Sequence, residues 1–306
     1  MRNLVFLLLV SLGSLSLFGD DLSQLVAKAN AGDAAAQYQL GTMYNTGNGV
    51  QRDPDQAFNW FQNAARQGHV GAMYRLAIAN YNGGTLGDSV KENLGLSWAW
   101  FKLAAAAGDS AAQNDAARMW NELSERERQS APALLGDMVA TLATSTDVSR
   151  WMRPESDAGQ MLTRMRDAKT HLSSERHDEQ TASLECATAF GSKPAAALCM
   201  GLLYEMQPDP DPRRATEWYR KAADQLEPHA MFHMGAMYAG HASPKEALLE
   251  GYFWFSLANR YGDKRASTAM TQIAATADPK TISKAEAKAQ HFADNHTPRS
   301  LPRLQH

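Results

Sequence analysis

A nine-residue motif that occurs four times constrains the fold of this chain more than any other feature. Each copy begins with a small residue, carries an aromatic pair at its fourth and fifth positions and has alanine at its eighth. The copies span residues 57–65, 97–105, 215–223 and 251–259. The spacing i, i+3, i+4, i+7 and i+8 places these positions on one face of a helix. Repetition of such a motif predicts a stacked repeat architecture.

A second pattern predicts a first helix before each copy of the motif. A small residue directly follows an apolar one at Leu40-Gly41, Leu76-Ala77, Met200-Gly201 and Met234-Gly235. Glycine inside a helix costs about 1 kcal/mol relative to alanine. Glycine at three of the four matching positions therefore indicates close backbone contact between the two helices of each repeat.

The spacing between repeats predicts how they stack. The small residue of the next first helix always lies 17 positions after the tryptophan of the motif, as Ala77 does after Trp60. The distance within a repeat varies instead, as expected for stacked hairpins with a fixed interface and an exposed tip. Helix-capping sequences begin at Asp53, Ser89 and Ser243. We therefore predict an all-α fold, an α-solenoid of stacked helical hairpins, with the motif tryptophans in its core.

The chain resembles the Sel-one-like repeat family, a branch of the tetratricopeptide-type helical repeats. The resemblance rests on L-G-x-x-Y from Leu40, G-x-G-V-x-x-D from Gly47, the aromatic motif, and closing glycines. These glycines are Gly68, Gly108 and Gly262. The resemblance implies a right-handed superhelix whose first helices line a concave side. It also implies adaptor or scaffold work, in bacteria often at the envelope.

The predicted domain organisation is a duplicated half behind a targeting segment. Residues 1–19 have a positive start, a short apolar run and a small-residue cleavage site, which is typical of a secretory signal peptide. The alternative is that this segment is retained as an uncleaved anchor. Repeat block one with a terminating helix spans 20–143, and a linker with extra helices spans 144–182. Repeat block two with its own terminating helix spans 183–294, and a disordered tail spans 295–306. Whether the two blocks form one superhelix or two hinged arms stays open.

Two cysteines, Cys186 and Cys199, lie on either side of Gly191, which marks the turn of a helical hairpin. In an exported protein such a pair predicts a disulfide. The alternative is two buried free thiols on helix faces.

The chain shows no catalytic motif and no convincing metal site. His229 and His233 have the i, i+4 spacing of metal ligands, but the glutamate of H-E-x-x-H is absent and no third ligand is evident. We interpret them as packing or surface histidines. The sequence predicts no catalytic residue, no metal and no cofactor.

By analogy with the tetratricopeptide-type family, the concave groove has candidate partner-binding residues on the first helices. The groove-facing candidates are Tyr38, Tyr74 and Phe232, and the candidates near the groove end are Asn45, Tyr81 and Glu205. Aromatic side chains there suit a peptide or an extended chain. The alternative is that these side chains pack between neighbouring first helices.

The preferred functional hypothesis is an exported, periplasmic or secreted scaffold that binds a protein or peptide. A net charge of −3 without a long basic run makes nucleic acid a poor partner, and no second membrane stretch follows the leader. One alternative is a structural subunit of an envelope secretion or export assembly. Another is penicillin binding or β-lactam hydrolysis, which the resemblance implies for cysteine-rich relatives, whereas this chain has two cysteines.

Overall fold

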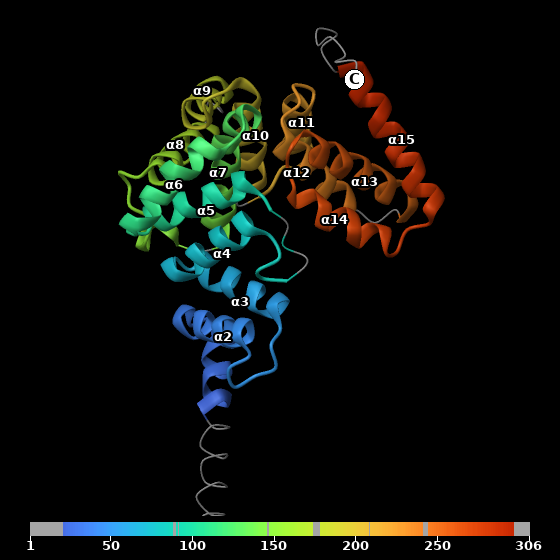
Figure 1. Ribbon diagram of the computed structural model, residues 1–306. Helices are drawn as coiled ribbons and strands as arrows, with labels where there is room; N and C mark the ends of the chain where they lie inside the picture. The colour runs from blue at the N-terminus through green and yellow to red at the C-terminus, as the bar shows by residue number, and fades with distance from the viewer. Residues whose placement is uncertain are drawn as a thin grey trace, which may run out of the picture. The chain divides into compact units, whose positions relative to one another are not determined.

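The computed structural model describes residues 21–87, 90, 92–145, 147–173, 178–207, 209–240 and 244–296. All regular structure in these residues is helical, so the prediction of an all-α solenoid is confirmed (Figure 1). The predicted signal peptide, the predicted caps at Ser89 and Ser243, and residues 297–306 of the predicted tail lie outside the described residues. Asn295 and His296, which the sequence prediction also places in the tail, belong to the last helix. Within the described residues no single helix is long and apolar enough to cross a membrane. Only the helices α9 (Glu179–Phe190) and α10 (Lys193–Glu205) taken together, with a bend of 119° between them, have the length and apolar composition of a span.

The chain packs as two compact units. The described part of unit 1 comprises residues 21–124 and Thr141–Gly159, and that of unit 2 comprises Glu125–Ala140 and residues 160–296. In unit 1, residues 21–30 are helical. The following elements are α2 (Ala34–Thr46), α3 (Pro54–Arg66), α4 (Val70–Asn82), α5 (Leu94–Ala106), α6 (Ser110–Glu122) and the 3₁₀ turn η1 (Val148–Arg150).

Unit 2 begins with the first residue of α7 (Glu125–Ser145), whose end from Thr141 belongs to unit 1, and it contains most of α8 (Asp157–Ser173). The remaining helices are α9 (Glu179–Phe190), α10 (Lys193–Glu205), α11 (Pro212–Ala223), α12 (Pro228–Ala239), α13 (Pro244–Tyr261), α14 (Arg265–Ala274) and α15 (Pro279–His296). The closest helix pairs are the hairpins α2–α3, α4–α5, α10–α11 and α12–α13. Helix α15 covers α13, with the Phe292 ring edge-on to Phe253 and Trp254.

In three of the four hairpins, α2–α3, α10–α11 and α12–α13, a ring of the second helix lies against the glycine of the first. A Cβ added to Gly41 would lie 2.9 Å from the Phe61 ring, and one added to Gly201 would lie 2.3 Å from the Tyr219 ring. The expected close contact is therefore real in these hairpins, and a side chain at either glycine would displace the ring. The fully buried member of the aromatic pair is its second residue, since Phe61 and Tyr219 are 0% exposed.

The prediction that all four motif tryptophans lie in the core is only half right. Trp100 and Trp254 are buried, whereas Trp60 and Trp218 are half-buried. In these two motifs the second ring, Phe61 or Tyr219, takes the innermost place, so the tryptophan lies nearer the rim of the hairpin. Trp218 consequently keeps part of its ring accessible.

In each turn that joins one repeat to the next helix, one residue has a positive φ, in the left-handed region of backbone conformation. Gly68, Gly108 and Gly262 have φ values of 86°, 109° and 122°. In the joint before α12 this place is taken by Leu226, with φ 64°, the one non-glycine residue of the described chain with positive φ. The following residue caps the next first helix, as Asp109 does by accepting the N–H of Ala112 at 3.1 Å.

The segment predicted as a linker packs against the closing turns of unit 1. The Trp151 ring lies against Gly68, where an added Cβ would come within 2.3 Å of it, and the Arg153 guanidinium lies against Gly108. The Arg153 N–H also donates to the carbonyl oxygen of Ala106 at 2.8 Å. Residues 147–156 are therefore part of the repeat packing of unit 1.

Helix α7 differs from the expectation of a terminating helix for block one, because residues Glu125–Ala140 belong to unit 2. A Cβ added to Gly136 would lie 2.4 Å from the Phe190 ring. Ala133 and Ala140 flank this glycine on the same face and are buried in the core of unit 2. The small-residue face of α7 thus fits the ring of α9 so closely that this part of the helix packs in unit 2.

Candidate functional site

The six predicted groove residues fall in both units. Tyr38 and Asn45 lie on α2 and Tyr74 and Tyr81 on α4, all in unit 1, whereas Glu205 on α10 and Phe232 on α12 lie in unit 2. No single site brings the six together within one unit, so we describe each set by itself.

In unit 1, Tyr38 and Tyr74 contact the first helix of the following repeat. The Tyr38 ring stacks on His69 at a centroid distance of 4.4 Å. The Nδ1 atom of His69 accepts the N–H of Ala72 at 3.2 Å and so caps α4, and burial lowers the pKa of His69, which suits a neutral acceptor. The Tyr74 hydroxyl donates to Asp115 Oδ2 at 2.6 Å. Both tyrosines remain half-buried.

Tyr81 and Asn45 lie at the C-terminal ends of their helices. Tyr81 is 38% exposed, one of two large hydrophobic side chains exposed in the described chain. Its hydroxyl bonds to Glu122, and this bond raises the pKa of Tyr81. Asn45 is half-buried, and its main-chain oxygen accepts from Arg52 Nε at 3.0 Å. Tyr81 is therefore the most accessible aromatic side chain among the predicted residues.

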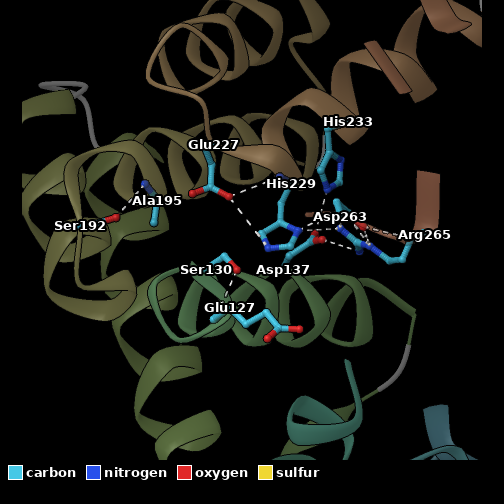
Figure 2. A network of polar contacts seen from close by, with 10 residues as sticks. All are labelled: Glu127, Ser130, Asp137, Ser192, Ala195, Glu227, His229, His233, Asp263 and Arg265. Atoms are coloured by element: carbon cyan, nitrogen blue, oxygen red, sulfur yellow. Dashed lines mark hydrogen bonds and ion pairs between the residues drawn. The ribbon is translucent and has the colours of Figure 1, made fainter. Parts of the chain in front are cut away.

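Unit 2 contains a buried polar network centred on Asp137 of α7 (Figure 2). Asp137 is 0% exposed. One carboxylate oxygen, Oδ1, lies 2.8 Å from His233 Nε2 of α12, and the other, Oδ2, lies 2.6 Å from Arg265 Nη1 of α14. A single carboxylate therefore ties three helices together through two cationic side chains.

Asp263, in the turn before α14, continues the network. Arg265 donates to it from Nε at 2.9 Å and from Nη2 at 2.5 Å, a bidentate geometry that favours ion pairing. His229 Nδ1 lies 3.0 Å from Asp263 Oδ2. Glu227 caps α12 by accepting the His229 N–H at 3.3 Å, and its Oε1 lies 4.0 Å from His229 Nε2.

Glu205 and Phe232, two of the predicted residues, border this network. The Tyr219 hydroxyl donates to Glu205 Oε2 at 2.6 Å, and His233 Nδ1 lies 3.6 Å from the same oxygen. The Tyr219 ring stacks on His233 at 5.0 Å. The Arg265 guanidinium lies 4.5 Å above the Phe232 ring. Glu205 and Phe232 thus each contact a member of the network, Glu205 through His233 and Phe232 through Arg265.

In this network, neighbouring opposite charges offset the effect of burial on the pKa of each group. Burial alone would lower the pKa of His233, but Asp137 and Glu205 raise it to about 9. Burial would raise the pKa of Asp137 and of Asp263, yet Arg265 and the histidines hold both well below the usual range. Asp263 likewise raises the pKa of His229 against its burial. Buried charges are tolerated only when paired in this way.

The paired charges of this network hold α7, α12 and α14 together. The two histidines of the i, i+4 pair face different carboxylates, His229 facing Asp263 and His233 facing Asp137. Among the described residues no group of three or more His, Cys, Asp or Glu side chains could hold a metal ion. The sequence interpretation of packing histidines omitted Asp137, Asp263 and Arg265. One signal was present for Asp263, since it follows a closing glycine as the capping residue Asp109 does.

Cys186 of α9 and Cys199 of α10 form a disulfide with a Cα–Cα distance of 5.7 Å. Both residues are 0% exposed. The predicted pairing is confirmed, and the alternative of two free thiols is wrong. The bridge joins α9 to the first helix of the third hairpin.

The Sel1 repeat family model matches four segments, residues 34–69, 70–109, 194–225 and 228–263. Each segment covers one of the four hairpins described above. Among solved structures, the chain is similar to a protective antigen present in uropathogenic Escherichia coli strains that displays an SLR fold. The identity is 22%, the match covers 90% of this chain and 72% of that chain, and the TM-score is 0.31.

A Sel1 repeat protein from Oxalobacter formigenes is also similar. It is 22% identical, with 87% of this chain and 88% of that chain covered and a TM-score of 0.28. No curated protein matches the sequence.

Proposed function

Because the chain belongs to the Sel1 repeat family, we propose that it is an exported scaffold of the bacterial envelope that binds a protein or peptide partner. The observation that carries the proposal is the set of four Sel1 repeats, since such repeats generally mediate protein–protein interaction scaffolding. Stacked repeats offer extended concave surfaces, and binding is their usual use. The family is a non-enzymatic interaction fold, and we extend that property to this chain.

Export is supported by two features of the chain. Residues 1–19 have the composition of a secretory leader. The Cys186–Cys199 disulfide suits an oxidising compartment, because cytosolic proteins rarely keep such bonds. Cell fractionation and the intact mass of the purified protein test this part. A protein that keeps residues 1–19 and stays in the cytoplasm would contradict it.

The proposed binding surface is the concave side formed by the first helices, with Tyr38, Tyr74 and Tyr81 as its anchors in unit 1. Their rings are half-buried or exposed and are held by neighbouring side chains. Rigid aromatic side chains that keep accessible surface are typical interface anchors.

The test is affinity capture with crosslinking from the cell envelope, using the mature chain as bait. Changing Tyr38, Tyr74 and Tyr81 to alanine should remove the dominant partner, whereas Lys280→Ala, at an exposed position of α15, should not. Tyr74→Phe keeps the ring but loses the bond to Asp115, so it should retain binding if the ring is the anchor. Unchanged capture by the triple variant, with its helicity intact, would refute the anchor assignment.

A further inference from the structure

A groove of about 810 Å³ opens in unit 2 on a surface that none of the predicted residues lines. Its walls come from α9, from the first turns of α10, and from α11 with the turn that follows it. The apolar lining consists of Leu184, Ala187, Ala196, Ala197 and Trp218. The volume lies within the range of ligand-binding clefts, roughly 300–1,000 Å³.

Comparison with the other repeats indicates why no side chain fills this space. Ala197 stands four residues before Gly201, the small residue of its helix. At the matching places, four residues before Ala77 and Gly235, the chain has Met73 and Met231, each 0% exposed. A methionine side chain fills space there in two other repeats, and alanine leaves that space open.

Two large apolar side chains of the groove remain accessible. Leu184 is 65% exposed, the most exposed large hydrophobic side chain of the described residues. Trp218 is half-buried, as Trp60 is, whereas the motif tryptophans Trp100 and Trp254 are buried. Exposed apolar side chains gathered in a concave place indicate a surface that a partner covers.

The rim of the groove carries more positive than negative charge. Lys193 begins α10 and Lys221 lies on α11, with its ammonium 3.7 Å from the centre of the Trp218 ring. Within the described part of the chain neither lysine forms an ion pair, and Asp224 is the one carboxylate of the lining. The N-terminal end of α10 adds a partial positive charge beside Lys193.

We propose that this groove docks an acidic amphipathic segment of a partner protein. A large apolar side chain of that segment lies between Leu184, Ala197 and Trp218, and its carboxylates pair with Lys193 and Lys221. The inference rests on the proposed function only in taking the partner to be a protein. The groove is a second binding surface, separate from the concave side with Tyr38 and Tyr74. The Cys186–Cys199 bridge, two residues after Leu184 and two after Ala197, holds α9 against α10 and so keeps the groove preformed.

The first test is a peptide titration with the mature chain. The probe is a fluorescent amphipathic helical peptide with leucine on one face and glutamate elsewhere, and its control has lysine in place of glutamate. Fluorescence anisotropy should show at least about tenfold tighter binding of the acidic peptide, with loss of the preference at high salt. Equal affinity for both peptides, or no binding of the acidic one, overturns the proposal.

Two variants locate the binding. Ala197→Met fills the groove with the side chain used in the other repeats, so it should weaken the acidic peptide by about tenfold or more while the melting temperature stays equal or rises. Lys193→Glu with Lys221→Glu should reverse the peptide preference. Unchanged affinity in both variants overturns the site. The double variant Tyr38→Ala with Tyr74→Ala should bind the acidic peptide with unchanged affinity. This control distinguishes failure of the groove proposal from failure of the proposed binding on the concave side.

The second test identifies the natural occupant. A photo-crosslinking residue at position 184 should capture an acidic amphipathic segment in the intact envelope, and one at the exposed position 280 of α15 should not. Two other outcomes would refute the proposal. One is a dimer of this chain that Leu184→Asp dissociates, and the other is binding to anionic vesicles that the same change abolishes.

Discussion

Each cationic side chain of the network in unit 2 lies beside a carboxylate. Asp137 pairs with His233 and Arg265, and Asp263 pairs with Arg265 and His229. Removing one member of such a set leaves its neighbours charged and largely buried without a partner. The cost of that loss is larger than the net contribution of the ion pair itself.

We therefore predict that Asp137→Asn, which keeps the shape of the side chain, lowers the free energy of unfolding by about 3–5 kcal/mol. The matched control is Asp157→Asn, because Asp157 is exposed and pairs with Lys102 at the surface. That change should cost less than about 1 kcal/mol. Urea denaturation measures both, and equal costs would show that the buried network contributes no more than a surface pair.

A second prediction concerns the glycines of the closing turns. Gly32 and Gly68 both have positive φ, 93° and 86°, but an added Cβ meets no atom within 4 Å at Gly32 and lies 2.3 Å from the Trp151 ring at Gly68. Gly32→Ala should cost about 1–2 kcal/mol from backbone strain alone. Gly68→Ala should cost about 1–3 kcal/mol more because the ring must move. In a Trp151→Ala background the two changes should have the same effect on denaturation.

At the scale of elements, the disulfide holds α9 to α10 across a sequence separation of 13 residues. In the entropy model a loop of this size contributes about 3 kcal/mol. Replacing both cysteines by alanine should therefore speed hydrogen exchange in α9 and α10 and leave α2–α6 of unit 1 unchanged. A reductant should reproduce the effect in the natural chain and have none on the double variant. Equal exchange of α9 in the two forms would contradict the prediction.

At the scale of the whole molecule, the network makes the stability of unit 2 depend on pH. The pKa of His233 is raised from 6.5 to about 9, so its contribution is complete below about pH 6.5 and is lost as the pH rises through 9. The pKa values of Asp137, Asp263 and Glu205 are lowered, so their contributions are present above the usual carboxyl range and are lost in acid. Glu227 has the opposite sign, because burial raises its pKa.

Unit 2 should consequently be most stable in the mildly acidic range and should lose about 3 kcal/mol between pH 6.5 and 9 through His233. Hydrogen exchange of unit 2 peptides across this range measures the loss. His233→Gln should flatten the profile above pH 6.5 at the cost of lower stability at pH 6. An unchanged slope in that variant would assign the pH dependence to other groups.

The amino-acid sequence by itself determined the helical hairpins, their joints and the paired cysteines of this protein. These features depend on contacts between neighbouring turns or neighbouring helices, so periodicity and spacing reveal them. Gly41 against Phe61 is such a contact, because the small residue and the ring recur together in each repeat.

Only the tertiary structure decided the rest. The packing of α7 in unit 2, the contact of Trp151 with Gly68 and the pairing of Asp137 with Arg265 join segments far apart along the chain and occur once. No repeat marks them, and a lone buried aspartate or tryptophan has the same local pattern as an exposed one. The groove beside Ala197 is also a property of packing, since three helices supply its lining and Ala197 stands where two other repeats have a buried methionine.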